Sequence, residues 1–402
     1  MLLSRNYFLT LLVMASFCGT AFGLRATAVK AQGPGPGAGG ALAGLTPQEL
    51  TEFRRGRGAF LRVERNNTGL GPAFNAASCA ACHNVPSIGG TSPFLVVRAA
   101  YRNEDGTMRG LDAFGETLVH LTSIPPHDCQ PVIPSDVAVV AHRASIPMFG
   151  AGLVEAIPDE VIQALADPND VDGDGISGRA SIVRDQASGI FRVGRFGWKG
   201  QHATLLAFGA DAFRGEMGIT NDLFPDELAV GVPILNRTLC DGQPDPEDTP
   251  DPATGSRRID DFEAFMRFLA PLPRGPLTGD VVDGEGLFRE IGCAECHQPS
   301  LVTGPSESAA FDRRAVPLFS DLLLHDVGTG DGIPQAAALP NELRTPALWG
   351  LRFRLPLLHD GSASTIEDAI RRHGVEAESV RRTFELLSVA DRARLLAFLN
   401  SL

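Results

Sequence analysis

The 402-residue chain has little cysteine, no excess of positive charge and no internal repeat of short period. Acidic residues outnumber basic ones by 48 to 35, which gives a formal charge of −13 and argues against nucleic acid and anionic membranes as partners. Beyond the N-terminus, no apolar run approaches the length of a membrane-spanning helix. With only seven cysteines, chance is a poor explanation for any cysteine pattern that occurs twice.

The first residues have the pattern of an export signal. Arg5 supplies a positive charge, Tyr7–Phe17 is apolar, and small residues offer cleavage sites after it. Because the apolar run is short, we predict a signal peptide over residues 1–23, cut between positions 23 and 31, and not a transmembrane anchor. The mature protein is then exported or periplasmic. The following segment, 32–44, is rich in glycine, alanine and proline, which predicts a flexible leader.

The pattern Cys-x-x-Cys-His occurs twice, at Cys79–His83 and at Cys293–His297. This spacing is typical of c-type haem attachment, in which two thiols bind one porphyrin and the adjacent histidine binds its iron. A zinc knuckle or a redox dithiol is the alternative, but neither requires the histidine. We predict two covalent haems c. Their attachment residues and proximal ligands are Cys79, Cys82, His83, Cys293, Cys296 and His297.

Two cysteines remain after the haem motifs and after Cys18, which leaves with the signal peptide. They are Cys129 and Cys240. An oxidising compartment favours a disulfide between them, and the alternative is two separate buried thiols.

The segment Asp170–Gly175 resembles a calcium-binding loop. Asp170, Asp172 and Asp174 alternate along it, and a glycine follows for the turn. The twelfth position is Ser181 where an EF-hand has glutamate, so the loop is not a complete EF-hand. The alternative is an acidic surface loop without an ion.

Helix signals dominate the remaining pattern. Thr46–Glu49 is a capping box with proline at the first helical position, and Ser388–Asp391 caps a final helix with one apolar stripe. The predicted fold class is all-α with long loops, in two cytochrome c-like domains with one haem each. We place the N-terminal domain at 45–270 and the C-terminal domain at 278–402.

His373 is a candidate second ligand for the C-terminal haem. The capping box Ser364–Glu367 predicts a helix over Thr365–Gly374. Ile366, Ile370 and His373 follow at i, i+4 and i+7, which places the imidazole on the buried face. A histidine at such a position is either a satisfied core residue or an iron ligand.

Several further segments closely resemble the di-haem oxidoreductase family of peroxidase-like proteins, some of which are labelled thiol oxidoreductases. The resemblance runs from about Leu45 to Leu402 and extends distantly to bacterial di-haem cytochrome c peroxidases and to the relative that matures methylamine dehydrogenase. The segments are Gly69–Pro72, Phe196–Lys199, Glu216–Thr220, Leu323–Asp326, Arg344–Gly350 and His359–Gly361.

This resemblance implies a peroxidatic N-terminal haem and an electron-transfer C-terminal haem. Trp198 matches the inter-haem tryptophan, although it could also be a core residue. Glu216 matches a distal acid–base glutamate, with a surface glutamate beside Arg214 as the alternative. Phe208 stands near the position of the peroxidases' distal glutamine.

The resemblance also bears on the ligands. His373 lies 14 residues after His359, where the peroxidases carry methionine and the maturation enzyme tyrosine, so it matches a distal ligand. Ala99 stands where some peroxidases have a mobile blocking histidine, which favours an open first haem. His325, His359 and His202 have no assigned role, and each could line a haem.

The resulting hypothesis is a periplasmic peroxidase-like oxidoreductase. It reduces hydrogen peroxide with electrons from a small redox protein, a cytochrome c or a cupredoxin. The alternatives are oxidation of a protein substrate, electron carriage without catalysis, and oxidation of thiols.

Overall fold

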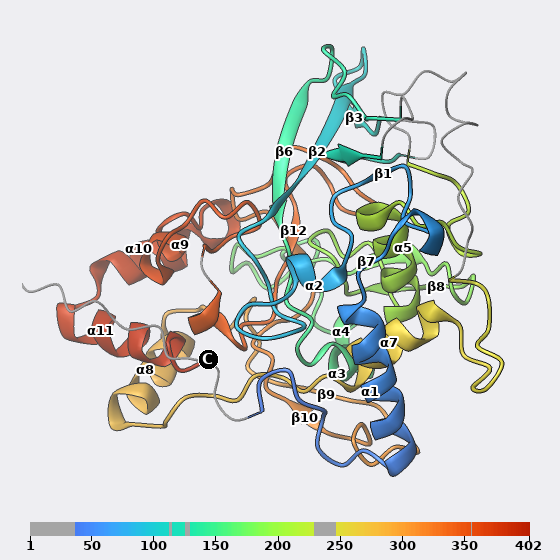
Figure 1. The fold of residues 1–402 in the computed structure, drawn as a ribbon. Helices are drawn as coiled ribbons and strands as arrows, with labels where there is room; N and C mark the ends of the chain where they lie inside the picture. Colours follow the sequence, from blue (N-terminus) through green and yellow to red (C-terminus); the bar gives the residue numbers. More distant parts are fainter. Residues whose placement is uncertain (1–36, 112–114, 125–128, 229–246, 355) are drawn as a thin grey trace, which may run out of the picture. The chain divides into compact units, whose positions relative to one another are not determined.

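The structure is a computed structural model that describes residues 37–402 except 112–114, 125–128, 229–246 and 355 (Figure 1). The predicted signal peptide and Cys240 lie outside these residues. No helix within the described ranges combines the length and apolarity needed to cross a membrane. From the predicted leader, Leu42 donates its backbone N–H to the carbonyl oxygen of Phe268 at 2.7 Å.

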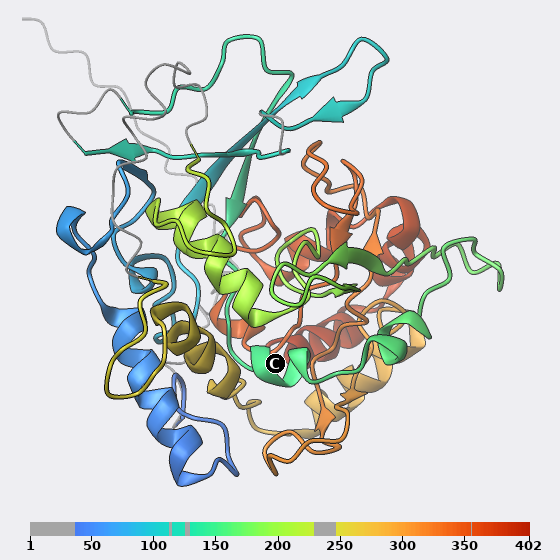
Figure 2. The same ribbon diagram turned by 90° about the vertical axis from the view of Figure 1, so that its right-hand side faces the viewer.

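Two helix pairs organise the chain, α1 with α7 and α8 with α11, and Figures 1 and 2 show the members of each pair side by side. Their bounds are α1 Pro47–Leu61, α7 Arg258–Phe268, α8 Gly279–Glu290 and α11 Val389–Leu399. Each pair crosses at a glycine. A Cβ atom on Gly56 would overlap the backbone oxygen of Asp261, and one on Gly284 would overlap that of Arg394. Glycine therefore permits the close approach in both pairs.

The predicted helix caps at both ends of the chain are confirmed. The hydroxyl of Thr46 accepts from the N–H of Glu49, and the Glu49 carboxylate accepts from the N–H of Thr46, which completes the capping box of α1. Ser388 accepts from the N–H of Asp391 at 3.1 Å and starts α11. The other helices within the described residues are α2 Cys79–Cys82, α3 Ala151–Glu155, α4 Asp159–Gln163, α5 Leu205–Met217, α9 Ile366–Arg371 and α10 Glu378–Leu386, with 3₁₀ turns at Asn66–Thr68, Leu351–Phe353 and Val375–Ala377.

The predicted all-α class is wrong, because the described chain contains several small antiparallel sheets. Strand β2 pairs with β3, β4 and β6, and this sheet stands out at the top of Figure 1. The strands are β1 Ala73–Phe74, β2 Leu95–Arg102, β3 Met108–Arg109, β4 Leu118–Val119, β5 Thr122–Ser123, β6 Val139–Ala144, β7 Ser181–Arg184, β8 Phe191–Gly194, β9 Leu301–Val302, β10 Ala315–Val316, β11 Leu324–His325 and β12 Leu343–Arg344. Adjacent valines in β2 and β6 favour extended backbone, and an Asp105-Gly106 turn between β2 and β3 is a hairpin signal that the helical prediction overlooked.

Each helix pair lies in its own hydrophobic core, and both cores belong to the compact unit Gln32–Leu402. In the first core the rings of Phe60 and Phe262 stack at 5.4 Å. In the second, Phe288 and Phe398 pack at 5.1 Å. Each core therefore places an aromatic wall beside one Cys-x-x-Cys-His motif, since Phe60 and Phe288 each lie 6.3 Å from the motif's histidine ring.

Candidate di-haem active site

The first Cys-x-x-Cys-His motif opens into a cavity with about 1140 Å³ of empty space. The short helix α2 carries Cys79 and Cys82, and His83 follows as its C-cap. The His83 Nδ1 atom lies 2.9 Å from the carbonyl oxygen of Gly90. A carbonyl oxygen can only accept, so Nδ1 carries the proton and Nε2 keeps its lone pair. Burial lowers the pKa of His83 to about 4, which keeps the ring neutral and able to bind iron.

Glu216 lies on α5 and lines the same cavity. Burial raises its pKa to about 7. The amide of Asn75 donates to Glu216 Oε2 at 2.8 Å, which holds the carboxyl group in place. A carboxyl group with this pKa can both accept and return a proton at neutral pH.

Phe208 lines this cavity, as expected from its position near the peroxidases' glutamine. The structure also brings Gln201 to the cavity, three residues after Trp198. The Gln201 Oε1 atom accepts from the N–H of Lys199 at 3.3 Å. Sequence reasoning missed this amide because it comes from the turn before α5 and not from the helix.

Ala99 stands where some peroxidases have a mobile blocking histidine, and it is fully buried on β2. Among the described residues that line the first cavity, His83 supplies the only imidazole. His202 instead lies 3.0 Å from the carboxylate of Asp211, and Asp211 lines the cavity. The described side chains therefore leave the cavity without a second histidine.

The second motif opens into a larger cavity, with about 1340 Å³ of empty space. Cys293, Cys296 and His297 line it. The Nδ1 atom of His297 lies 3.0 Å from the carbonyl oxygen of Phe319, so this ring also presents an unprotonated Nε2. Burial lowers the pKa of His297 to about 4.

His373 lines the same cavity as His297. Its Nδ1 atom donates to the carbonyl oxygen of Ala369 at 2.8 Å, which again leaves Nε2 free to bind a metal. Helix α9 ends just before it, and the N-cap is Thr365, whose hydroxyl accepts from the backbone N–H three residues on, at 3.0 Å. The predicted cap at Ser364 is therefore wrong by one residue, but the imidazole is on the buried face.

Trp198 lines both cavities. Its side chain is 6% exposed, and Nε1 donates to the carbonyl oxygen of Ala144 at 2.8 Å. The guanidinium of Arg354 lies 4.9 Å from the indole centroid, and the His359 ring packs edge-on at 6.2 Å. The indole is thus the side chain placed between the two candidate haem sites.

Both cavities contain buried polar atoms that have no partner among the described residues. They are Arg98 Nε and Arg143 Nη2 in the first, and Arg354 Nη2 and His359 Nδ1 in the second. Burial lowers the pKa of Arg354 to about 10, an indication of a cation without a nearby carboxylate. The two propionates of a haem would accept from such groups. The Cys-x-x-Cys-His donors and these unpartnered atoms fit one haem in each cavity.

The ligand atoms of Asp170, Asp172 and Asp174 lie within 4.8 Å of one another, and all three residues are exposed. Exposed acidic groups often converge without an ion, so calcium binding here stays a prediction.

Cys129 is buried and disulfide-bonded. Its predicted partner Cys240 lies outside the described residues, so the pairing stays a prediction. A bonded Cys129 is not the free thiol that thiol oxidation would use.

A family model described as "di-haem oxidoreductase, putative peroxidase" matches residues 129–402. The match covers more than half of the chain, so the chain belongs to this family and is a di-haem, peroxidase-type oxidoreductase. It begins after the first Cys-x-x-Cys-His motif, later than the expected start at about Leu45. A search of curated proteins finds no match.

Solved structures give weaker likenesses. Hydrazine synthase from Kuenenia stuttgartiensis is 15% identical, with 99% of this chain and 100% of that chain covered and a TM-score of 0.39. The diheme peroxidase BthA from Burkholderia thailandensis E264 is 18% identical, with coverages of 88% and 86% and a TM-score of 0.40. A MauG-like protein associated with microbial copper homeostasis is 18% identical, with coverages of 69% and 94% and a TM-score of 0.31. TM-scores this low establish no shared function.

Proposed function

We propose that this protein is an exported di-haem c-type cytochrome that reduces hydrogen peroxide at its N-terminal haem, with electrons that enter at its C-terminal haem. One observation carries the proposal. Glu216 lines the first cavity, His373 lines the second, and Trp198 lines both. The two sites are therefore built for different tasks and share one aromatic side chain.

The two motifs would hold the haems covalently through Cys79, Cys82, Cys293 and Cys296. His83 and His297 would bind the iron atoms through Nε2, because a backbone carbonyl holds each Nδ1. When bound, haem supplies the redox chemistry, since its iron changes oxidation state and can bind an oxygen ligand at an open position.

Glu216 is the proposed acid–base group. Reduction of one hydrogen peroxide to two waters consumes two electrons and two protons, and it requires a proton to move from one peroxide oxygen to the other. A carboxyl group with a pKa of about 7 serves both steps near neutral pH. Asn75 orients this group, and Phe208 adds an apolar ring to the lining of the cavity.

His373 is the proposed second ligand of the C-terminal haem. Two histidines would close that iron to peroxide and give it a lower potential than a histidine–methionine pair. The C-terminal haem would then receive electrons from a small periplasmic donor, a cytochrome c or a cupredoxin. The indole of Trp198 would relay them to the N-terminal haem.

The test is electron paramagnetic resonance of the resting and the half-reduced holoprotein, each titrated with hydrogen peroxide. We expect one haem to stay low-spin in both states. The other haem should be high-spin, or become high-spin on half-reduction, and only this haem should respond to peroxide. Two haems that stay six-coordinate and low-spin in both states would refute peroxide reduction. N-terminal sequencing of the exported protein tests the signal peptide.

A further inference from the structure

One segment of the chain, residues 319–327, contacts both sides of the C-terminal cavity. At its start, the carbonyl oxygen of Phe319 accepts from Nδ1 of His297 at 3.0 Å. At its end, the carbonyl oxygen of Val327 accepts from the backbone N–H of the residue that follows His373, at 2.9 Å. We call residues 319–327 the strap, because it joins the two histidine-bearing segments.

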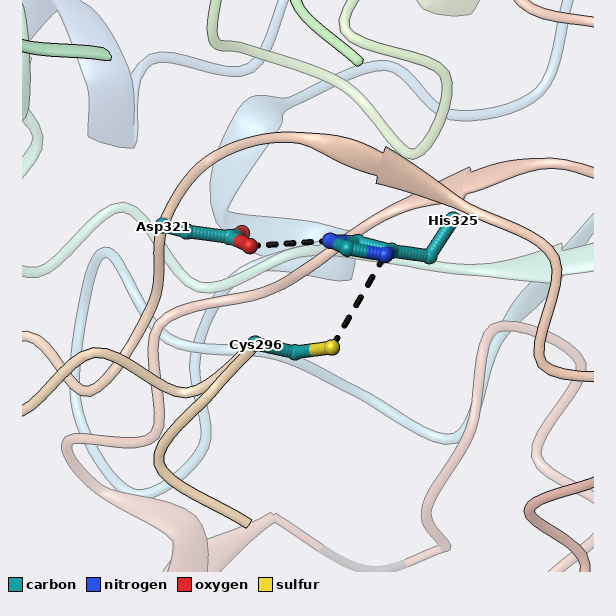
Figure 3. A group of neighbouring side chains, drawn as sticks. All are labelled: Cys296, Asp321 and His325. Atoms are coloured by element: carbon teal, nitrogen blue, oxygen red, sulfur yellow. Dashed lines mark hydrogen bonds and ion pairs between the residues drawn. The ribbon is translucent and has the colours of Figure 1, made fainter. Parts of the chain in front are cut away.

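His325 lies in the strap between acidic and sulfur groups (Figure 3). Its Nε2 atom lies 2.8 Å from a carboxylate oxygen of Asp321, and its Nδ1 atom lies 2.8 Å from one of Glu376. Nδ1 is also 3.7 Å from Sγ of Cys296. Carboxylate oxygens accept, so both ring nitrogens carry protons and the ring is a cation. Burial alone would lower the pKa of His325, but the bonds to Asp321, Cys296 and Glu376 raise it to about 12.

This arrangement does not suit a metal ion, although cysteine, aspartate and histidine ligand atoms come close together here. Each nitrogen of His325 is already committed to a carboxylate. Cys296 is moreover one of the proposed haem-attachment residues. The group is better described as an imidazolium held by two carboxylates directly beside the haem-attachment site.

We call His325, Asp321 and Glu376 the ion cluster. Glu376 connects this cluster to the candidate ligand His373, which lies three residues before Glu376. Both of its carboxylate oxygens are used. Oε2 also accepts from the N–H of Ser177 at 3.0 Å, and Oε1 accepts from the N–H of Asp326 in the strap at 2.8 Å. The turn that carries His373 is thus fixed to the strap by side-chain and backbone bonds.

The same parts of the chain hold unfavourable backbone conformations. Phe319 and Leu322 in the strap have φ of 53° and 64°, and Val375, between His373 and Glu376, has φ of 49°. A left-handed conformation is unfavourable for a non-glycine residue, and it is least favourable for a β-branched residue. Such conformations persist only where neighbouring contacts fix them. On one side of Val375 the N–H of Gly374 donates to the carbonyl oxygen of Val327, and on the other the carboxylate of Glu376 bonds to His325 and Asp326.

We propose that His325, held between Asp321 and Glu376, is a latch that keeps His373 at the C-terminal haem and so keeps that haem six-coordinate and closed to peroxide. The latch rests on the proposed function, because it takes His373 as the second ligand. His325 is a positioning residue. It acts through the strap and the His373 turn, and it contacts no reacting atom.

The test compares the low-spin signal of the C-terminal haem in the wild-type holoprotein and in the variants Glu376→Gln and His325→Gln. We expect both variants to lose part of this signal and gain a high-spin signal, while the spectrum of the N-terminal haem does not change. Added imidazole should restore the low-spin signal, because it can fill a position that His373 has left. Glu378→Gln is the matched control. It removes the same charge two residues away, where the carboxylate pairs with Arg381 and Arg382.

The variant His373→Ala separates the latch from the ligand assignment. If His373→Ala produces a high-spin C-terminal haem and Glu376→Gln keeps the wild-type spectrum, the latch is refuted and the proposed function stands. If His373→Ala itself leaves the spectrum unchanged, His373 is not a ligand. The latch and the assignment of His373 as the second ligand then both fail. Should His325→Gln not load haem, Glu376→Gln, which removes only one of the two carboxylates, decides the matter.

Discussion

The two candidate haem sites have nearly the same surroundings at the motif histidine and unlike linings elsewhere. In each, a carbonyl oxygen holds the motif histidine's Nδ1, at 2.9 Å for His83 and 3.0 Å for His297. In each, a phenylalanine ring lies 6.3 Å from that imidazole. The rest of the lining differs, because one cavity contains Glu216 and the other contains His373. A shared attachment motif therefore fixes how a haem is held, while distant segments decide what it can do.

The two cavities also differ in the acidic residues that line them. Glu116, Asp211 and Glu216 all line the first cavity. Arginines line both cavities, Arg98 and Arg143 in the first and Arg344 and Arg354 in the second, but among the described residues no aspartate or glutamate lines the second. A buried carboxyl group can accept and release a proton, so the carboxylates in its lining favour the first site as the place of the proposed proton transfer.

The largest expected effect comes from the variant Glu216→Gln. The amide keeps the shape of the side chain but cannot accept a proton. We expect peroxide turnover to fall by about 10²–10⁴-fold, the usual contribution of a positioned acid–base group. Steady-state oxidation of a reduced cytochrome c or cupredoxin by peroxide measures it, at equal haem content.

Glu263→Gln is the matched control for this variant. Burial also raises the pKa of Glu263 to about 7, but this residue lies on α7 and lines neither haem cavity. Its variant should keep wild-type turnover. Equal losses in both variants would mean that Glu216 acts through general stability and not through chemistry.

The pH dependence of turnover should follow the carboxyl group of Glu216. Burial raises its pKa to about 7, so below pH 7 the proton-accepting form is the minor one. Turnover should therefore rise about tenfold per pH unit below 7 and level off above it. The profile should be flat in Glu216→Gln. A wild-type profile that falls between pH 5 and 7 would contradict the assignment.

Features encoded by adjacent residues could be predicted from the sequence. The caps at Thr46 and Ser388 are confirmed because each depends on residues within one turn. The four-stranded sheet was missed, because β2 and β6 are separated by more than 35 residues and their pairing is not a local property. A valine-rich strand also resembles a buried helix segment when it is short.

The same limit applies to the candidate sites. The motif residues and His373 could be proposed from spacing, and the structure brings His297 and His373 to one cavity. The contact of His325 with Glu376 spans 51 positions, so no sequence pattern indicates it. Gln201 reaches the first cavity only because of the turn that follows Trp198. Side chains placed by folded turns were the ones that sequence reasoning did not find.

A smaller effect is expected from Trp198→Phe, which tests the connection between the two sites. Phenylalanine keeps most of the packing but lacks the indole and its bond to Ala144. The measurement mixes half-reduced protein with peroxide and follows the rate at which the C-terminal haem is oxidised. We expect this rate to fall on the order of tenfold, which is about 1.4 kcal/mol in the barrier. The other tryptophan is the control, since Trp349 is buried but lines neither haem cavity. A rate unchanged in Trp198→Phe would exclude the relay.

The smallest effects should come from alanine substitutions at glycines in the two helix pairs, which pack alike. Gly56→Ala and Gly284→Ala would push a methyl group into the facing helix, and each should lower the free energy of unfolding by about 1–3 kcal/mol. Gly58 and Gly286, two residues further along α1 and α8, face open space, so alanine there should stabilise by up to about 1 kcal/mol. Thermal unfolding of the four holoprotein variants measures both the expected losses and the expected gains in the free energy of unfolding. The same pattern in both helix pairs would show that the two pairs pack in the same way, so the two candidate sites would differ in their linings, which include Glu216 in one and His373 in the other, and not in their helix pairs.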